Sequence, residues 1–391
     1  GENKFREITL VREKIEIDPI TYSALLDDNV GYFHYSGFTN GSSSRVKETI
    51  LDLKKKGAKS LVIDLRGNGG GILDEAVNVV NFFVQKGLEI VSTRGKVKQW
   101  DRSYRTQNQP LDTLMPIVVL IDTGSASASE IVAGSLQDLD RAVIIGNRSF
   151  GKGLVQTPRD LPYGGNIKIT TSKYYIPSGR CIQALDYSHR NPDGSVARVP
   201  DSLTHVFKTK NGREVRDGGG ITPDYLIPQE KGGTIGYYLL TENIIFDYVT
   251  GWVIKHPTVA SPASFRLSDT DYEQFKQFVK TKDFQYDQMS NRSLQSLKNI
   301  MEFEGYFNTA SEEFKALEEK LQPDLDRDLD LFRKEIIKMI ETEIVQRYYY
   351  KEGVLMYELR DDAALKKAEE VLKNKQLYDY TLQPKPATIP Q

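Results

Sequence analysis

Residues 121–156, IDTGSASASEIVAGSLQDLDRAVIIGNRSFGKGLVQ, contain the change from strand to helix that decides the fold. They begin in an apolar run typical of a buried strand. After Thr123-Gly124, serines and small residues precede apolar residues at helical spacing, which predicts a helix that begins near Ser127. A second apolar run, residues 142–145, predicts another strand, and Gly151-Lys152-Gly153 follows it. The stretch therefore predicts part of an α/β fold, with a serine at the start of a helix and a lysine after the next strand.

These two residues suit acyl-transfer chemistry. Unpaired N–H groups and the helix dipole at a helix N-terminus stabilise an oxyanion beside a serine. A lysine is a general base only when it is neutral, so the ordinary lysine pKa of about 10.4 must fall to roughly 7–8. Desolvation lowers a lysine pKa, whereas a neighbouring carboxylate opposes this. No acidic residue occurs between Arg141 and Arg159, so the local sequence permits a lysine base.

Each feature also has a simpler explanation. The run SASE, residues 127–130, fits the S-x-x-E capping box, in which the serine only caps the helix. A lysine in a glycine-rich turn is usually a surface residue. Residues 146–152 match G-x-x-x-x-G-K of the nucleotide-binding P-loop, but Gly153 stands where Ser or Thr should bind magnesium. Where a helix should begin, prolines lead instead into an alternating pattern that predicts a strand at residues 166–175. None of these explanations accounts for the serine and the lysine together.

The runs GSASASEIVAGSLQD and GNRSFGKGLVQ resemble the signature of the C-terminal processing peptidases, also called tail-specific proteases. That family uses a Ser–Lys dyad. The resemblance assigns the nucleophile to Ser127 and the general base to Lys152, and it matches Gln156 to the glutamine that helps to position the lysine. Contact between Lys152 and Gln156 across this spacing of four requires a helical turn after Lys152. It implies a serine endopeptidase that cleaves extended or unfolded polypeptides, in a tail-directed manner, through an acyl-enzyme.

A glycine-rich run, RGNGGG at residues 66–71, follows another predicted buried strand. Glycines between a strand and a helix let the backbone approach a ligand and present N–H groups to it. The run resembles the L-R-x-N-x-G-G motif of the same family, whose backbone contributes to the oxyanion hole. The resemblance implies this role for Gly70, with Gly71 as its neighbour, and the expected second donor is the N–H of Ala128.

Two further runs, KYYIPSGRCIQ at residues 173–183 and GGGITPD at residues 218–224, also resemble landmarks of the family. They extend the resemblance from about Phe5 to Ile227. The implied fold is a crotonase/ClpP-like β–α superhelical protease core of the α/β class.

We expect three segments. An N-terminal strand and linker segment occupies residues 1–28, and alternating residues at 8–17 predict one or two strands there. The α/β serine peptidase core occupies residues 29–232, and a helical C-terminal region occupies residues 233–391. In the family a PDZ domain precedes a similar strand pair; we expect that residues 1–391 do not include that domain and that native residues lie upstream of Gly1.

Two charged segments of the helical region open with Ser268-x-x-Asp271 and Ser311-x-x-Phe314. An apolar stripe predicts a long helix and consists of Leu329, Ile336, Ile340 and Ile344. The sequence does not disclose the task of this region, and homo-oligomerisation through it is one expectation.

Composition and net charge limit the classes of molecule that this chain is expected to bind. A net charge of −2 and a pI near 6.2 argue against nucleic acid as the main partner. Cys181 is the single cysteine, and the four histidines are scattered without metal-ligand spacing. We therefore expect polypeptide substrates, no cofactor, no metal and no membrane-spanning segment. The resemblance implies a periplasmic or other extracytoplasmic location.

Two other classes of function stay open. One is a catalytically idle peptide-binding scaffold, which the intact Ser127 and Lys152 disfavour. The other is a crotonase-like acyl-CoA enzyme, which would use the same oxyanion geometry. Chemistry of that kind usually relies on carboxylates, and the sequence around Lys152 has none.

Overall fold

Two structural units divide the chain in the computed structural model, which describes residues 5, 7–15, 17–228, 233–287, 289–321 and 324–384. The first unit contains the chain up to Pro228 and again from Ala363 onward. The second unit contains the intervening residues up to Asp362. The second unit is therefore inserted in the sequence of the first.

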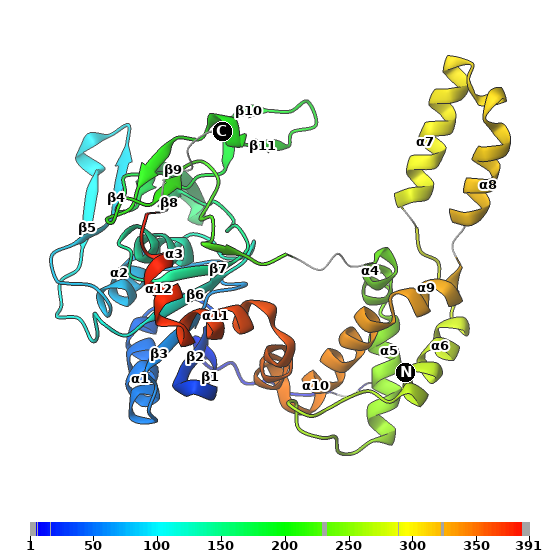
Figure 1. The fold of residues 1–391 in the computed structure, drawn as a ribbon, viewed down its shortest axis with the longest axis horizontal. Coiled ribbons are helices and arrows are strands. Elements are labelled where there is room, and N and C mark those ends of the chain that lie inside the picture. The colour runs from blue at the N-terminus through cyan, green and yellow to red at the C-terminus, as the bar shows by residue number, and fades with distance from the viewer. Residues whose placement is uncertain are drawn as a thin grey trace. The chain divides into compact units, whose positions relative to one another are not determined.

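A six-stranded sheet forms the centre of the first unit (Figure 1). Its strands, in spatial order, are β1 (Ile20–Leu25), β2 (Val30–Tyr35), β3 (Ser60–Asp64), β6 (Ile117–Ile121), β7 (Val143–Gly146) and β14 (Tyr225–Leu226). Strand β1 is antiparallel to β2, and the other neighbours pair in parallel. The inner strands are apolar runs buried on both faces, as parallel sheets require.

Helices cover both faces of this sheet. On one face lie α1 (Ser42–Lys55), α2 (Leu73–Asn81) and α3 (Ala128–Asp138), whose apolar residues share a core with inward residues of the strands. The other face contacts α11 (Ala363–Lys373) through β6 and β7, and α12 (Lys375–Thr381) follows α11. The hydroxyl of Tyr378 in α12 accepts a hydrogen bond from the N–H of Ile117 at 3.0 Å. The last two helices therefore complete the α/β unit.

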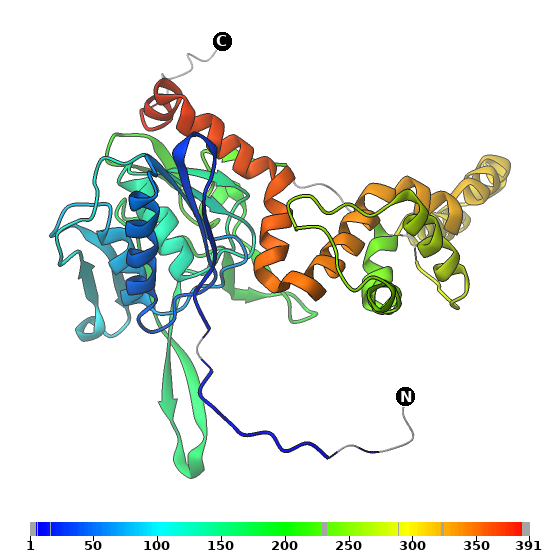
Figure 2. The ribbon, with the colours of Figure 1, turned by 90° about the horizontal axis from the view of Figure 1, so that it is seen from below.

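A second, antiparallel sheet flanks the central one. Its order is β5 (Arg102–Arg105), β4 (Glu89–Gly95), β9 (Asn166–Tyr175) and β8 (Leu154–Asp160). Figure 2 shows the β8–β9 hairpin extending away from the body of this unit. Two small hairpins follow, formed by β10 (Leu185–Arg190) with β11 (Val196–Arg198) and by β12 (Val206–Lys208) with β13 (Glu214–Arg216).

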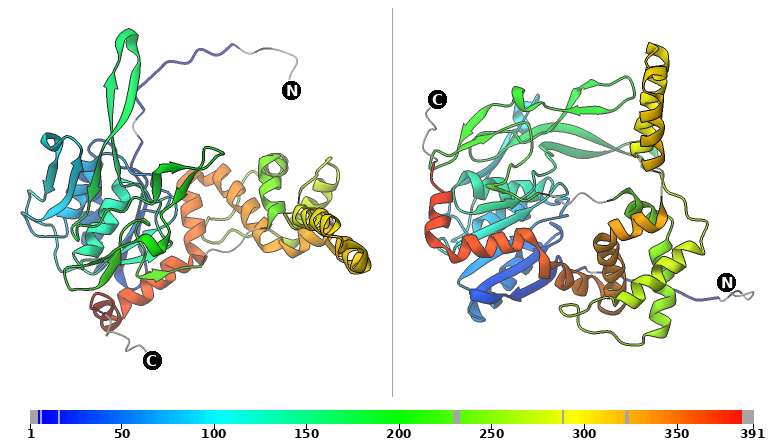
Figure 3. Two further views of the ribbon diagram at one scale, coloured as in Figure 1. Left: turned by 90° about the horizontal axis from the view of Figure 1, so that it is seen from above. Right: turned by 45° about the vertical axis from the view of Figure 1, so that its right-hand side comes forward.

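The second unit is helical and has its own core, which includes Tyr272, Phe275 and Ile340. Its helices are α4 (Thr234–Thr241), α5 (Ile244–Lys255), α6 (Asp269–Lys280), α7 (Met289–Glu304), α8 (Ser311–Leu321), α9 (Leu325–Leu331) and α10 (Arg333–Glu358). Helices α7 and α8 form an antiparallel pair (Figure 3). Within the described ranges, none of the helices combines the length and the apolar character that crossing a bilayer requires.

The mixed α/β core and the helical region after it are confirmed, with three differences. The predicted strands at 8–17 are wrong for the described residues of that range, which form no strand, because strand pairing requires an edge and their apolar side chains are all exposed. The stripe from Leu329 to Ile344 is buried, but it spans two helices, since the chain leaves helical geometry at Phe332. Part of the predicted region 233–391, from Ala363 onward, belongs to the α/β unit.

We expect Tyr378→Phe to lower the free energy of unfolding of the α/β unit by about 1–3 kcal/mol, because the buried N–H of Ile117 loses its acceptor. Urea unfolding followed by circular dichroism, with hydrogen exchange of peptides that cover β6, measures this. Tyr380→Phe is the matched control, since Tyr380 is 57% exposed on the same helix. Equal hydrogen-exchange rates of β6 in the two variants would contradict the stabilisation of this strand by α12.

Candidate active site

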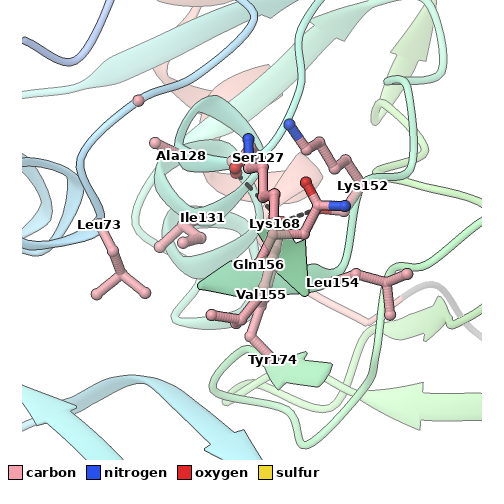
Figure 4. A pocket seen from close by; sticks show the side chains of 11 residues that line it. Leu73, Ser127, Ala128, Ile131, Lys152, Leu154, Val155, Gln156, Lys168 and Tyr174 are labelled. Atoms are coloured by element: carbon pink, nitrogen blue, oxygen red, sulfur yellow. Dashed lines mark hydrogen bonds between the residues drawn. The ribbon is translucent and has the colours of Figure 1, made fainter. Parts of the chain in front are cut away.

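A pocket of about 270 Å³ in the first unit contains most of the predicted site residues (Figure 4). Its lining comes from the glycine-rich loop, the starts of α2 and α3, the loop after β7, and strands β8 and β9. The residues are Gly71, Leu73, Ser127, Ala128, Ile131, Lys152, Leu154, Val155, Gln156, Lys168 and Tyr174. The fold thus brings together the predicted serine, lysine and glutamine, and no acidic side chain is part of this lining.

Ser127 occupies a strained turn. It precedes the first residue of α3, as predicted, and its φ of 58° and ψ of −113° lie outside the regions that non-glycine residues prefer. A serine on a sharp, strained strand-to-helix turn is how α/β-hydrolases expose a nucleophile. The capping-box arrangement with Glu130 is also present, and the N–H of Ser127 donates to Glu130 Oε2 at 2.9 Å. Helix capping and a position in the pocket therefore coexist at this residue.

The two neighbouring serines have structural contacts instead. Ser125 and Ser129 are fully buried. The hydroxyl of Ser125 donates to the carbonyl of Leu65, and that of Ser129 donates to the carbonyl of Asn68, both at 2.8 Å. These bonds hold the glycine-rich loop against the start of α3. Of the three serines, only Ser127 lines the pocket.

The glycine-rich loop presses directly on Ser127. A Cβ atom at Gly70, where φ is +97°, would lie 2.7 Å from Ser127 Cβ and 2.8 Å from Ala128 N, so only glycine fits there. The N–H of Gly70 already donates to Asn68 Oδ1 at 2.9 Å. By contrast, the N–H groups of Gly71 and Ala128 have no acceptor among the described residues, and both residues line the pocket. The geometry therefore favours Gly71, rather than Gly70, as the partner of Ala128.

The backbone on both sides of Lys152 packs against residues 183–184 and fixes the position of this lysine. A Cβ at Gly151 would lie 2.2 Å from Ala184 Cβ, and the N–H of Gly153 donates to Gln183 Oε1 at 2.8 Å. The flanking glycines therefore let the chain lie flat on residues 183–184. Figure 4 shows the Lys152 side chain extending toward Ser127. Its amine has neither an ion pair nor a hydrogen bond to any residue in the described part of the chain.

Glu130 links the serine and lysine segments. This fully buried side chain accepts four hydrogen bonds. Oε1 accepts from Ser149 Oγ at 2.5 Å and from the N–H of Gly151 at 2.7 Å. Oε2 accepts from the N–H groups of Ser127 at 2.9 Å and Lys152 at 2.8 Å. Burial raises the pKa of the Glu130 carboxyl above its usual range, and the hydrogen bonds oppose that rise.

Sequence reasoning missed this carboxyl group beside the lysine segment. It considered only acids close to Lys152 in the sequence, whereas Glu130 arrives from α3. The signal was present in the S-x-x-E pattern, which was interpreted only as a helix cap.

Tyr174 is a second link that the sequence did not single out. This buried hydroxyl lies within hydrogen-bonding distance of the carbonyl of Lys152 and at 3.3 Å from that of Ser127, as the dashed lines in Figure 4 show. Burial holds the pKa of the Tyr174 hydroxyl well above its usual value, so it stays protonated and donates. The peptide groups of the two predicted catalytic residues are thus tied together on both their N–H and their carbonyl sides.

Gln156 reaches the pocket in a different way from the one expected. The predicted helical turn after Lys152 is wrong, because Leu154 already pairs with β9. The pairing shifts between Val155 and Gln156, where β9 contains one extra residue, Thr171. Such β-bulges re-aim side chains next to functional sites. The spacing of four therefore brings Gln156 to the pocket along a bulged strand.

Catalysis by a metal has no evident ligand set here. Within the described ranges, no group of three or more His, Cys, Asp and Glu side chains is arranged to hold an ion. The polar groups that line the pocket are hydroxyl, amine, amide and backbone N–H. This set suits nucleophilic attack by a hydroxyl, proton transfer to an amine and stabilisation of an oxyanion.

Comparison with known families gives two matches. Residues 29–189 match the model of peptidase family S41. Residues 235–372 match the model described as the C-terminal helical domain of a probable PDZ-protease.

Individual relatives align with about half of the chain. The carboxy-terminal-processing protease of Bartonella bacilliformis is 43% identical over 189 residues, which are 47% of this chain and 43% of that protein. The chloroplastic C-terminal processing peptidase of Tetradesmus obliquus is 32% identical over 196 residues, which are 47% of this chain and 42% of that protein. A solved structure titled photosystem II D1 C-terminal processing protease has 29% identity and a TM-score of 0.41, covering 55% of this chain and 50% of that one. This chain thus spans less than half of the length of both curated relatives.

We expect a serine-directed acylating reagent to label Ser127 and to leave Ser125 and Ser129 unmodified, since both of these are buried and engaged. Ser125→Ala and Ser129→Ala should keep the labelling, although each should lower the free energy of unfolding by about 1–3 kcal/mol through a carbonyl left without its donor. Peptide mapping by mass spectrometry reads out the site. A label on either outer serine would overturn the choice of Ser127.

Proposed function

We propose, from the match of residues 29–189 to the model of peptidase family S41, that this chain is a serine endopeptidase whose nucleophile is Ser127 and whose general base is Lys152. The observation that carries the proposal is the pocket. As far as the described residues show, it combines one accessible serine, an amine without an ion-pair partner and two N–H groups without acceptors. The peptide-binding scaffold and the acyl-CoA enzyme explain this combination less well, because neither needs the lysine.

In the first step, Ser127 Oγ attacks the carbonyl carbon of an extended peptide while the neutral amine of Lys152 takes the hydroxyl proton. Negative charge develops on the carbonyl oxygen. The N–H groups of Ala128 and Gly71 donate to it, and the positive end of the α3 dipole adds to this stabilisation. Both donors are fixed before the substrate binds, so little reorganisation is needed in the transition state.

In the second step, the C–N bond breaks, and the ammonium of Lys152 gives its proton to the leaving amine. The acyl group remains as an ester on Ser127. Water then attacks this ester with Lys152 again as the base, which releases the new carboxyl end of the peptide and regenerates the serine.

Positioning residues keep the lysine in place during both steps. Gln156 lines the pocket beside Lys152 and is suited to orient the amine through its amide. Glu130 and Tyr174 act one layer deeper, on the backbone of both catalytic residues. Tail-directed cleavage is part of the proposal because the relatives are named for carboxy-terminal processing. Action outside the cytoplasm and homo-oligomerisation stay predictions.

We expect Ser127→Ala and Lys152→Ala each to lower turnover of an unfolded protein substrate about 10³-fold or more. The double variant should be little worse than either single variant, because the two residues act as a unit. Turnover of denatured casein, with circular dichroism to establish folding, measures this. Full activity in either folded alanine variant would refute the dyad.

Lys152→Arg tests whether the lysine acts as a base or only as a charge. Arginine keeps the positive charge but stays protonated in proteins, so it cannot accept the serine proton. We expect this variant to be as inactive as Lys152→Ala. Gln156→Ala should be milder, since water can partly replace an orienting amide. Substantial turnover by Lys152→Arg would exclude the proposed proton transfer.

A further inference from the structure

A second lysine, Lys168, lines the same pocket as Ser127 and Lys152. It belongs to β9, and Figure 4 shows its side chain among those directed to the Ser127 end of the pocket. The proposed mechanism does not use it. Its chemistry is therefore available for another purpose.

The position of Lys168 follows from the hairpin register. Lys168 lies opposite Pro158, and Thr170 lies opposite Gln156. Residues that face each other across antiparallel strands, and residues two apart along a strand, share one face. The side chains of Lys168 and Gln156 are therefore on the same face of the β8–β9 hairpin, diagonal to one another beside the pocket.

Lys168 has no acidic partner in the part of the chain that the structure describes, either as an ion pair or as a hydrogen bond. Several other exposed lysines do, for example Lys56 with Asp52 at 2.8 Å and Lys373 with Asp28 at 2.9 Å. The carboxyl group that accepts hydrogen bonds from the backbone of Ser127 and Lys152, that of Glu130, is buried and already accepts four hydrogen bonds. The pocket thus presents a cation without a complementary charge of its own.

We infer that Lys168 is a specificity residue that binds a carboxylate of the substrate close to the scissile bond. This inference rests on the proposed peptidase function and adds a substrate class to it, namely peptides with an acidic residue next to the cleavage site. The amine of Lys152 has to be uncharged when it accepts a proton, so Lys168 is the lysine of the pocket that is free to pair with an anion. A free C-terminal carboxylate offers the same chemistry as an acidic side chain.

The test uses four peptides of one sequence, with Glu or Gln flanking the scissile bond and with a free or an amidated C-terminus. Wild-type protein should show a kcat/KM about fivefold higher for the Glu peptides, the effect of one partly exposed ion pair. The Glu-to-Gln ratio should fall to about one in Lys168→Ala and should invert in Lys168→Glu. Lys173→Ala is the matched control, because Lys173 is exposed on the same strand but does not line the pocket, and it should keep the wild-type ratio.

Each outcome decides between specific alternatives. A preference that follows the free C-terminus instead of Glu, and that is lost in Lys168→Ala, supports the carboxylate site and assigns it to chain ends. A wild-type ratio of one, or a ratio unchanged in Lys168→Ala, overturns the inference while proteolysis stands. A parallel loss on Glu and Gln peptides in Lys168→Ala overturns it as well, since Lys168 would then serve the reaction in general. If no peptide is cleaved, and casein turnover does not depend on Ser127, the proposed function itself fails.

Discussion

The buried carboxyl group of Glu130 is the contact on which the geometry of the site depends, because it receives the N–H of Ser127 and the N–H of Lys152 on the same oxygen. Burying a carboxylate is costly unless its oxygens are fully hydrogen-bonded. Here three of the four donors are backbone groups, so the cost is offset only when the start of α3 and the loop after β7 take up one particular arrangement. The need to offset the desolvation of the Glu130 carboxyl therefore fixes the distance between the start of α3 and the loop after β7.

The runs at 173–183 and 218–224 also stabilise this arrangement, through contacts outside the pocket. Ser149 donates to Glu130 and accepts from the N–H of Ile221 at 2.6 Å, which joins the run at 218–224 to the site. At the other end of α3, Asp138 forms an ion pair with the fully buried Arg180 at 2.8 Å and accepts from the N–H of Ser178 at 3.0 Å. The position of α3 therefore also depends on the Asp138–Arg180 ion pair, which lies at the opposite end of this helix from Ser127. Loss of one partner of such a buried pair leaves the other charge uncompensated.

Local pattern was sufficient for the elements and insufficient for the contacts between them. The strand at 166–175 and the helix that begins after Ser127 follow from side-chain periodicity and small-residue signals, which depend on neighbours in sequence. The choice between Gly70 and Gly71 depends on which N–H is already used by Asn68, and the presence of Glu130 beside Lys152 depends on folding. The prediction of strands at 8–17 is wrong for the described residues because it rested on the alternation of side chains alone. Its alternation suits a strand, but a strand exists only where a partner edge is available.

The late position of α11 and α12 in the sequence has a consequence for when the site can form. One face of the central sheet, which carries Val62 and Val118, is covered by helices that follow the entire second unit. A ribosome releases the chain from the N-terminus, and domains generally fold as they emerge. The helical unit can form its core while one face of the sheet is still uncovered, because the helices that cover it, including Tyr378, are synthesised only after residue 362. Maturation of the α/β unit is thus coupled to the synthesis of α11 and α12, and a nascent chain that ends before them carries the proposed catalytic residues without the helices that cover this face of the sheet.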